Sequence, residues 1–250
     1  MTRLTLWPRG FGLRAAARED VALYVWFYEW TLWDAIRPGP HSRGAWDHPW
    51  QLSPAGDRAA MSSPPFSLEA ATVADGADLR LTVANETDYA WPEVAGIIPC
   101  LNPGGPLEGE PEIPVSEPLL DEAHAHTYFV GERGLDRLEA REIHFNHDLR
   151  ARIDDLADDG AFVFSDKWPT SDKDAYAGLI IREAPEAGWV GGIAWERYLS
   201  AQGHNPWRCM HLSVHLGPLA PGETRTVRGK VYLFEGTKDD CLSHYRADFA

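Results

Sequence analysis

The residues best suited to chemistry lie in the stretch 204–216, which reads HNPWRCMHLSVHL. If the chain is extended from Cys209 onward, alternation places Cys209, His211 and His215 on one face of a strand and only apolar side chains on the other. Short, half-buried polar groups suit the floor of a binding site, whereas a solvated strand face carries long charged side chains. An ordinary strand whose half-buried histidines are hydrogen-bonded fits the same pattern. The stretch predicts one strand face that packs in the core and one face whose side chains could take part in binding or catalysis.

A second stretch, 141–146, alternates in the same way. Ile143 and Phe145 are predicted to face the core, and the polar residues between them to share a groove with His211. Acid–base chemistry in such a groove needs an imidazole or carboxylate whose pKa is tuned by partial burial and neighbouring charges. We expect one histidine and one glutamate to form the pair, His204 or His211 with Glu142 or Glu196. The predicted catalytic residues are Glu142, His144, Glu196, His204 and His211.

The chain holds 11 tryptophans in 250 residues, and several stand beside Pro, Asp, Lys or Asn in segments of loop composition. The segment 36–50 is rich in proline and glycine, which disfavours regular structure there. Aromatic rings beside amide and carboxylate groups suit sugars, because rings stack on C–H faces while polar groups bind hydroxyls. The loop tryptophans could instead anchor loops onto the core.

Arg43 and Lys167 are expected to meet an anionic or hydroxyl-rich part of the ligand. The segment from Arg43 to Trp50 is predicted to cap the groove. The predicted substrate-binding residues are Arg43, Trp46, Asp47, Trp50, Asn146, Lys167, Trp168, Gln202, Asn205 and Trp207.

Metal ligation is an alternative to metal-free acid–base chemistry. On a strand, His211 and His215 lie about 13 Å apart at the usual rise per residue, which is too far for one ion. Cys209 with His211, or either with His204, can still chelate. The HAH sequence at 124–126 has the spacing of a cupin ligand pair, but no second cupin motif is evident. We therefore expect neither a metal nor another cofactor, and keep a metal-dependent cupin-like enzyme as an alternative.

The elements that must position these residues are mostly strands. The run 21–33 is dense in aromatic and β-branched residues and predicts a long buried strand, in which Glu29 needs either an arginine partner or a place in a site. Alternating runs flank turn residues in 66–83 and in 177–195, which predicts two hairpins. The segment 237–240 has the Thr-x-x-Asp pattern of a capping box, so a helix should follow it and pack on a sheet edge or across a sandwich end.

Length and charge limit the fold and its partners. We find no linker in the 250 residues, so residues 1–250 are predicted to form a single β-sandwich domain. With 23 Lys and Arg against 38 Asp and Glu, the net charge is −15, and neither nucleic acid nor membrane is an expected partner. The three cysteines are widely spaced, which favours a reducing compartment, and no signal peptide is recognised. We expect a cytoplasmic protein that binds a small-molecule or oligosaccharide substrate, with its oligomeric state undetermined.

Several blocks of the sequence resemble known proteins. The segments 79–87 (LRLTVANET) and 217–224 (GPLAPGET) are similar to segments of the large two-sheet sandwiches of the galactose mutarotase-like superfamily. The blocks 140–146, 167–171 and 202–207 resemble a group of uncharacterised bacterial β-sandwich proteins. The resemblance to the superfamily implies a concave sheet that binds sugars, with a His and a carboxylate as acid and base, as in epimerases and some lyases and hydrolases.

Together these features predict an all-β fold, a large two-sheet antiparallel β-sandwich of the mutarotase-like type with a short C-terminal helix. The predicted function is that of a carbohydrate-active enzyme of epimerase, lyase or hydrolase type, which uses a His/Glu acid–base pair in a groove lined by two polar strand faces. A non-catalytic carbohydrate-binding module is a further alternative, because it would need the tryptophans but not the acid–base pair.

Overall fold

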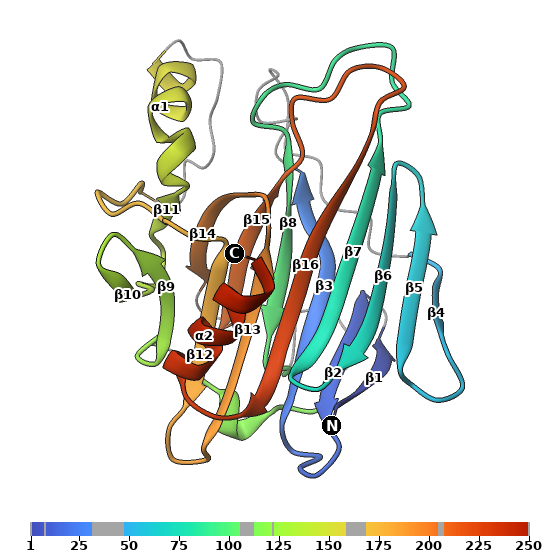
Figure 1. Ribbon diagram of the computed structural model, residues 1–250, viewed down its shortest axis with the longest axis vertical. Helices are drawn as coiled ribbons and strands as arrows, with labels where there is room; N and C mark the ends of the chain where they lie inside the picture. Colours follow the sequence, from blue (N-terminus) through green and yellow to red (C-terminus); the bar gives the residue numbers. More distant parts are fainter. Residues whose placement is uncertain are drawn as a thin grey trace.

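A computed structural model of the protein describes residues 2–7, 9–31, 48–105, 113–121, 123–158, 169–204 and 208–249, without the side chains of Trp30, Asp158 and His204. The strands form two antiparallel sheets stacked face to face, as the sequence predicts (Figure 1). The seven-stranded sheet has the order β1 (Thr2–Trp7), β2 (Gly10–Ala15), β3 (Ala22–Thr31), β8 (Gly96–Asn102), β15 (Cys209–His215), β14 (Tyr198–His204) and β11 (Ile143–Phe145). The nine-stranded sheet has the order β10 (Gly134–Arg137), β9 (Thr127–Gly131), β12 (Leu179–Ala184), β13 (Trp189–Trp195), β16 (Thr224–Glu235), β7 (Gly76–Ala84), β6 (Phe66–Val73), β5 (Arg58–Ser63) and β4 (Trp50–Leu52).

The main core lies between the two sheets. On β15, Met210, Leu212 and Val214 belong to this core, and the alternate residues Cys209 and His211 therefore lie on the outer face of the seven-stranded sheet. Burying each large apolar side chain contributes roughly 1.5–3 kcal/mol, which favours this orientation of the strand over the reverse. The two faces predicted for this stretch are confirmed.

Both predicted hairpins are present in the nine-stranded sheet. Strands β6 and β7 pair from Phe66 with Val83 to Val73 with Gly76, and β12 pairs with β13 over its whole length. Gly76 has a φ of 155°, and a Cβ there would lie 1.9 Å from the carbonyl oxygen of Val231, so only glycine fits at this turn.

The C-terminal helix α2 (Lys238–Phe249) begins at the predicted capping box. The backbone N–H of Thr237 donates to Asp240 Oδ2 at 2.9 Å, and the N–H of Asp240 donates to Thr237 Oγ1 at 3.3 Å. The helix lies across the outer face of the nine-stranded sheet, over β12 and β13, and not at a sheet edge or sandwich end (Figure 1). Its buried residues Cys241 and Leu242 cover apolar side chains that these strands turn outward.

The 3₁₀ turn η3 (His147–Leu149) and helix α1 (Arg150–Asp158) follow β11, and a second 3₁₀ turn, η2 (Glu117–Leu119), precedes β9. Ile153 of α1 packs against Ile143 and Phe145 on the outer face of the seven-stranded sheet. That face is therefore apolar beside α1 and carries polar groups across β14 and β15. Within the described ranges, no helix has the length and apolar character needed to cross a membrane.

Candidate functional site

An imidazole–carboxylate pair lies on the outer face of the seven-stranded sheet. His211 of β15 and Glu29 of β3 come from strands separated by β8, and His211 Nε2 lies 3.0 Å from Glu29 Oε2. Their side chains are only 3% and 11% exposed. A register irregularity in β3 lets Glu29 reach this face, because the two preceding residues, Phe27 and Tyr28, both pack in the main core.

The charge of Glu29 determines the protonation state of His211. Burial alone lowers the pKa of an imidazole, because it removes water from the charged form. The Glu29 carboxylate, with a smaller contribution from Cys100, outweighs the burial of His211 and raises the pKa of His211 to about 10. At neutral pH the pair is therefore an imidazolium facing a carboxylate, in which one group can donate a proton and the other can accept one.

The strand register extends this pair into a row of side chains across the sheet. Trp26 of β3 lies opposite Cys100 of β8, which lies opposite His211. On the other side, Gln202 of β14 lies opposite His211. The guanidinium carbon of Arg9 lies 3.9 Å from the centre of the Trp26 ring. The row thus runs from the Trp26 ring through Cys100 and His211 to the Gln202 amide, and rings and amides are groups that contact the faces and hydroxyls of a sugar.

Two thiols lie beside the ion pair. The ligand atoms of Cys100, Cys209 and His211 are all within 4.8 Å of one another, and the three residues are buried. Burial raises the pKa of the Cys100 thiol well above its ordinary value, and Asn102 Nδ2 donates to Cys100 Sγ at 3.6 Å. Two thiols and an imidazole are a donor set that zinc and other thiophilic ions prefer, provided that the thiols lose their protons on binding.

The prediction that the polar faces of β11 and β15 line one groove is wrong, because the polar face of β11 is turned into the sandwich. His144 lies opposite Ala201, a main-core residue of β14. The His144 ring stacks on Phe129 of the other sheet, with ring centroids 4.0 Å apart. Ile143 and Phe145, predicted to face the core, are turned to the outer face, where α1 covers them. Both faces of this short strand are buried, and the polar face is the inner one.

Glu142 and Glu196, the two glutamates predicted to be catalytic, do not lie beside His211. Glu142 lies near His144 instead. Burial lowers the pKa of His144, whose Nδ1 lies 3.0 Å from the Lys173 carbonyl oxygen. Glu142 Oε2 lies 3.9 Å from His144 Nε2. Glu196 accepts hydrogen bonds from the backbone N–H and the Nε of Arg228, at 2.7 and 2.8 Å. No described contact joins either carboxylate to His211, and their catalytic roles stay predictions.

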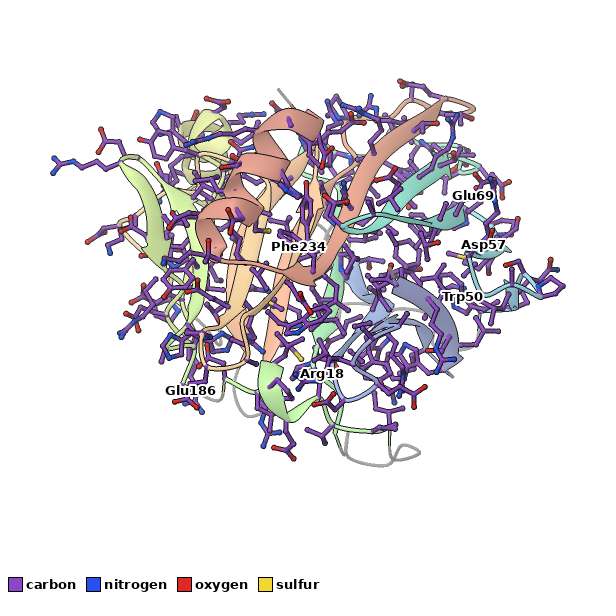
Figure 2. All side chains as sticks on the ribbon, turned by 60° about the horizontal axis from the view of Figure 1, so that its bottom comes forward. Arg18, Trp50, Asp57, Glu69, Glu186 and Phe234 are labelled. Atoms are coloured by element: carbon purple, nitrogen blue, oxygen red, sulfur yellow. The ribbon has the colours of Figure 1, made fainter. Side chains whose placement is uncertain are left out.

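Asn146 and Trp50 have partners within the fold. Asn146 accepts a hydrogen bond from the Asp148 N–H and donates one to the Tyr198 carbonyl oxygen, each 2.9 Å long, and so forms the cap of η3. Trp50 packs edge-on against Phe11, with ring centroids 5.6 Å apart, beside the N-terminal strands (Figure 2). The contact of Trp50 is the loop-anchoring one that the sequence left open, and the substrate-binding roles of both residues stay predictions.

Several predicted site residues lie outside the described residues. The backbone of His204 ends β14 opposite Cys209, but its side chain is not described. The other residues of this group are Arg43, Trp46, Asp47, Lys167, Trp168, Asn205 and Trp207. Their proposed contacts with substrate stay predictions.

The sequence pattern identified His211 and Gln202 as site residues, but it did not show that they lie beside Glu29 and Cys100. Glu29 was recognisable as a carboxylate inside an apolar run, and this was the available signal. Cys100 stands in the apolar run 97–101 without any accompanying motif. The register of β8 between β3 and β15, and of β14 beside β15, brings all four onto one face.

No protein-family model and no curated protein matches this sequence. Among solved structures, a protein described as an aldose 1-epimerase from Escherichia coli K12 is 11% identical with a TM-score of 0.45, over 94% of this chain and 99% of that one. A galactose mutarotase-like protein from Lactobacillus casei ATCC 334 is 9% identical with a TM-score of 0.42, over 94% of this chain and 100% of that one. A polysaccharide lyase is 9% identical with a TM-score of 0.42, over 95% of this chain and 33% of that one. The chain thus resembles galactose mutarotase-like proteins weakly in structure, and this likeness assigns no role to any residue.

Proposed function

We propose that the protein is a carbohydrate-active enzyme in which His211 and Glu29 form the acid–base pair. The observation that carries the proposal is the buried ion pair on the outer face of the seven-stranded sheet, with 3.0 Å between His211 Nε2 and Glu29 Oε2. A buried imidazolium and carboxylate are costly to retain for stability alone, and such pairs are concentrated at functional sites. Glu29 replaces Glu142 and Glu196 as the proposed carboxylate, because it is the one beside His211.

The pair can move two protons in one reaction. The imidazolium of His211 donates a proton to a sugar oxygen as its bond to carbon breaks, while Glu29 takes the proton of a second sugar hydroxyl. In an epimerase the ring oxygen and the anomeric hydroxyl would have these roles, and return of the two protons would close the ring again. Exclusion of water from the site strengthens both interactions.

The groups around the pair suit a sugar. The Gln202 amide offers both a donor and an acceptor. The Trp26 ring is buried, with the Arg9 guanidinium 3.9 Å from its centre, and adds an aromatic wall to the same face of the sheet. Trp207, Asn205 and Arg43, together with the other predicted loop residues, keep their proposed roles in stacking on the sugar and binding its hydroxyls.

The test compares binding and turnover in matched variants. A thermal-shift panel of neutral sugars and uronates identifies the ligand, and nuclear magnetic resonance then measures anomer exchange or product formation. Glu29→Gln and His211→Gln should each lower kcat by at least about 100-fold, the usual contribution of general acid–base catalysis. Glu142→Gln and Glu196→Gln should leave kcat within about threefold of wild type, a small change on the same free-energy scale.

Two outcomes would contradict the proposal. If Glu29→Gln keeps the wild-type rate while Glu142→Gln or Glu196→Gln loses it, the pair identified from geometry is the wrong one. If the wild-type protein binds a sugar but produces no change in it, and Glu29→Gln binds equally well, the protein is a carbohydrate-binding module.

A metal-dependent enzyme is the second candidate, and the cluster of Cys100, Cys209 and His211 favours it. Three protein ligands leave a fourth position of a zinc ion open for substrate or water. Glu29 would then orient the imidazole through its other ring nitrogen, as carboxylates commonly do for metal-bound histidines. The two candidates exclude each other, because a metal-bound His211 is not the proton donor. Elemental analysis of protein purified without a His tag separates them, since near-stoichiometric metal supports the second and contradicts the first.

A further inference from the structure

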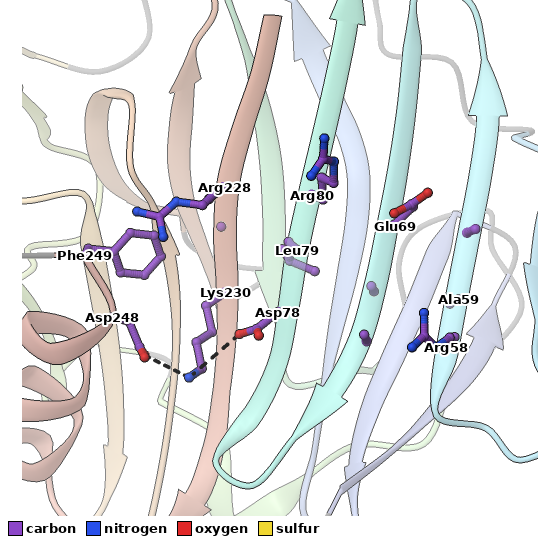
Figure 3. A pocket seen from close by; sticks show the side chains of 14 residues that line it. Arg58, Ala59, Glu69, Asp78, Leu79, Arg80, Arg228, Lys230, Asp248 and Phe249 are labelled. Carbon is purple, nitrogen blue, oxygen red and sulfur yellow. Dashed lines mark hydrogen bonds and ion pairs between the residues drawn. The ribbon is translucent and has the colours of Figure 1, made fainter.

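A groove of about 490 Å³ lies on the outer face of the nine-stranded sheet, so it belongs to the opposite side of the sandwich from the His211–Glu29 pair. It crosses β5, β6, β7 and β16, and Asp248 and Phe249 at the end of α2 form one wall (Figure 3). Ala60 and Ala71 line it between longer charged side chains. Its volume falls within the range of about 300–1,000 Å³ that small-ligand sites occupy.

The strand register places two arginines opposite each other in this groove. Glu69 of β6 lies opposite Arg80 of β7, and Arg80 lies opposite Arg228 of β16. Directly opposed like charges destabilise a sheet. Glu196 Oε2 accepts a hydrogen bond from Arg228 Nε at 2.8 Å, and the Arg228 guanidinium carbon lies 5.6 Å from the centre of the Phe249 ring. An anion placed between Arg80 and Arg228 would relieve their repulsion.

The positively charged side chains of the groove differ in whether carboxylates of the protein neutralise them. Lys230 Nζ lies 2.8 Å from both Asp75 Oδ1 and Asp248 Oδ2. By contrast, the exposed side chains of Arg58 and Arg80 make no hydrogen bond or ion pair within the part of the chain that the structure describes. Two such guanidinium groups in one groove stand out in a chain whose net charge is −15.

We propose that this groove binds an acidic oligosaccharide. The carboxylate of one uronate residue lies between Arg80 and Arg228, and Arg58 binds the carboxylate of another. Guanidinium groups bind carboxylates in a planar, two-point geometry that a free ammonium group does not match. The half-buried Phe249 ring, whose centre lies 5.1 Å from that of Tyr245, adds an apolar wall beside Arg228.

The spacing of the arginines favours a chain over a single small anion. Strands β5 and β7 are two strand spacings apart, or roughly 10 Å, so Arg58 and Arg80 reach different points along a ligand. The ligand class rests on the carbohydrate activity proposed above, whereas the place of the site rests on the groove alone.

Isothermal titration calorimetry with a galacturonate oligomer tests the proposal. Arg80→Gln and Arg58→Gln should each weaken binding by at least about tenfold, because each removes a charge-assisted hydrogen-bonding group. Arg137→Gln is the matched control, since Arg137 is an exposed arginine on β10 of the same sheet that pairs with Glu139. A neutral oligosaccharide of the same length and inorganic sulfate are the comparison ligands, and neither should bind with comparable affinity.

The outcomes separate this proposal from the proposed function. Uronate binding that persists in Glu29→Gln but weakens in Arg80→Gln supports the groove, whatever the effect of Glu29→Gln on turnover. Binding that is lost in Glu29→Gln and kept in Arg80→Gln places the uronate at the other sheet and overturns the groove proposal alone. Absence of uronate binding, equal binding of the neutral oligosaccharide, or full competition by sulfate also overturns it.

Discussion

Replacing Glu29 by Gln should reverse the pH dependence that His211 contributes to stability. In the native protein the pKa of His211 is raised to about 10, against an ordinary value of 6.5. A folded-state pKa above the unfolded value stabilises the protein fully below pH 6.5, and this contribution is lost as the pH rises through 10. The Glu29→Gln variant would keep the burial of His211 but lack the anion, so the pKa of His211 should fall below 6.5.

The loss of stability expected in Glu29→Gln follows from the shift in the pKa of His211. The difference between 6.5 and about 10 already includes the burial of His211 and corresponds to roughly 5 kcal/mol of preference for the protonated imidazole. It is an upper bound on the stability that the pair contributes, because desolvation of Glu29 offsets part of it. In the variant the imidazole can release its proton at neutral pH and so avoid an unpaired buried charge. We therefore expect a loss of about 3 kcal/mol at pH 7, at the low end of the range for a broken buried ion pair.

Urea unfolding between pH 7 and 9 measures directly how the unfolding free energy changes with pH. The unfolding free energy of the wild-type protein should fall by about 1.4 kcal/mol more per pH unit than that of Glu29→Gln. A titration of the histidine ring protons by nuclear magnetic resonance gives the pKa of His211 in each protein. The reasoning is refuted if His211 titrates near 6.5 in the wild-type protein, or if Glu29→Gln leaves its pKa unchanged.

Three further predictions concern the fold. Burial lowers the pKa of His215 to about 4, and its Nε2 lies 2.7 Å from the Glu93 carbonyl oxygen, so stability should fall as the pH decreases from 6.5 towards 4. His215→Gln should flatten that part of a urea-unfolding pH series, and an unchanged slope would contradict the assignment. Asp240→Ala should cost about 1 kcal/mol in urea unfolding by removing the α2 capping box, while Asp239→Ala, with its side chain 77% exposed, should cost almost nothing. Arg182 is fully buried and donates to Thr127 Oγ1 and the Arg208 carbonyl oxygen, so Arg182→Met should cost about 3–5 kcal/mol. A loss below about 1 kcal/mol in thermal or urea unfolding would show that this network is dispensable.

Local patterns were sufficient for much of the fold. The alternation from Cys209 to His215 identified both faces of β15, because an error of one residue would expose Met210, Leu212 and Val214. The turn residues between β6 and β7 identified a hairpin, and Thr237 with Asp240 identified the start of α2. In each case the interacting groups are close in the sequence, so their types and spacing carry the information.

The same reasoning failed at β11, where alternation alone did not show which face is inside. Ile143 and Phe145 are buried by α1, while His144 is buried against the second sheet. A strand covered on both sides has no solvated face, so apolar residues do not identify the core side. Only the packing of α1 on the outer face decided the orientation.

The sequence by itself determined that the chain forms strands in an all-β fold, that His211 lies on the face opposite to the core, and that Glu29 is a carboxylate in an apolar run. Only the tertiary structure decided that these two side chains meet, and that Arg80 and Arg228 face each other in a groove on the other sheet. The physical reason is that strand order and register join residues far apart in the chain. A periodic pattern records which face a residue occupies but not which strand lies beside it.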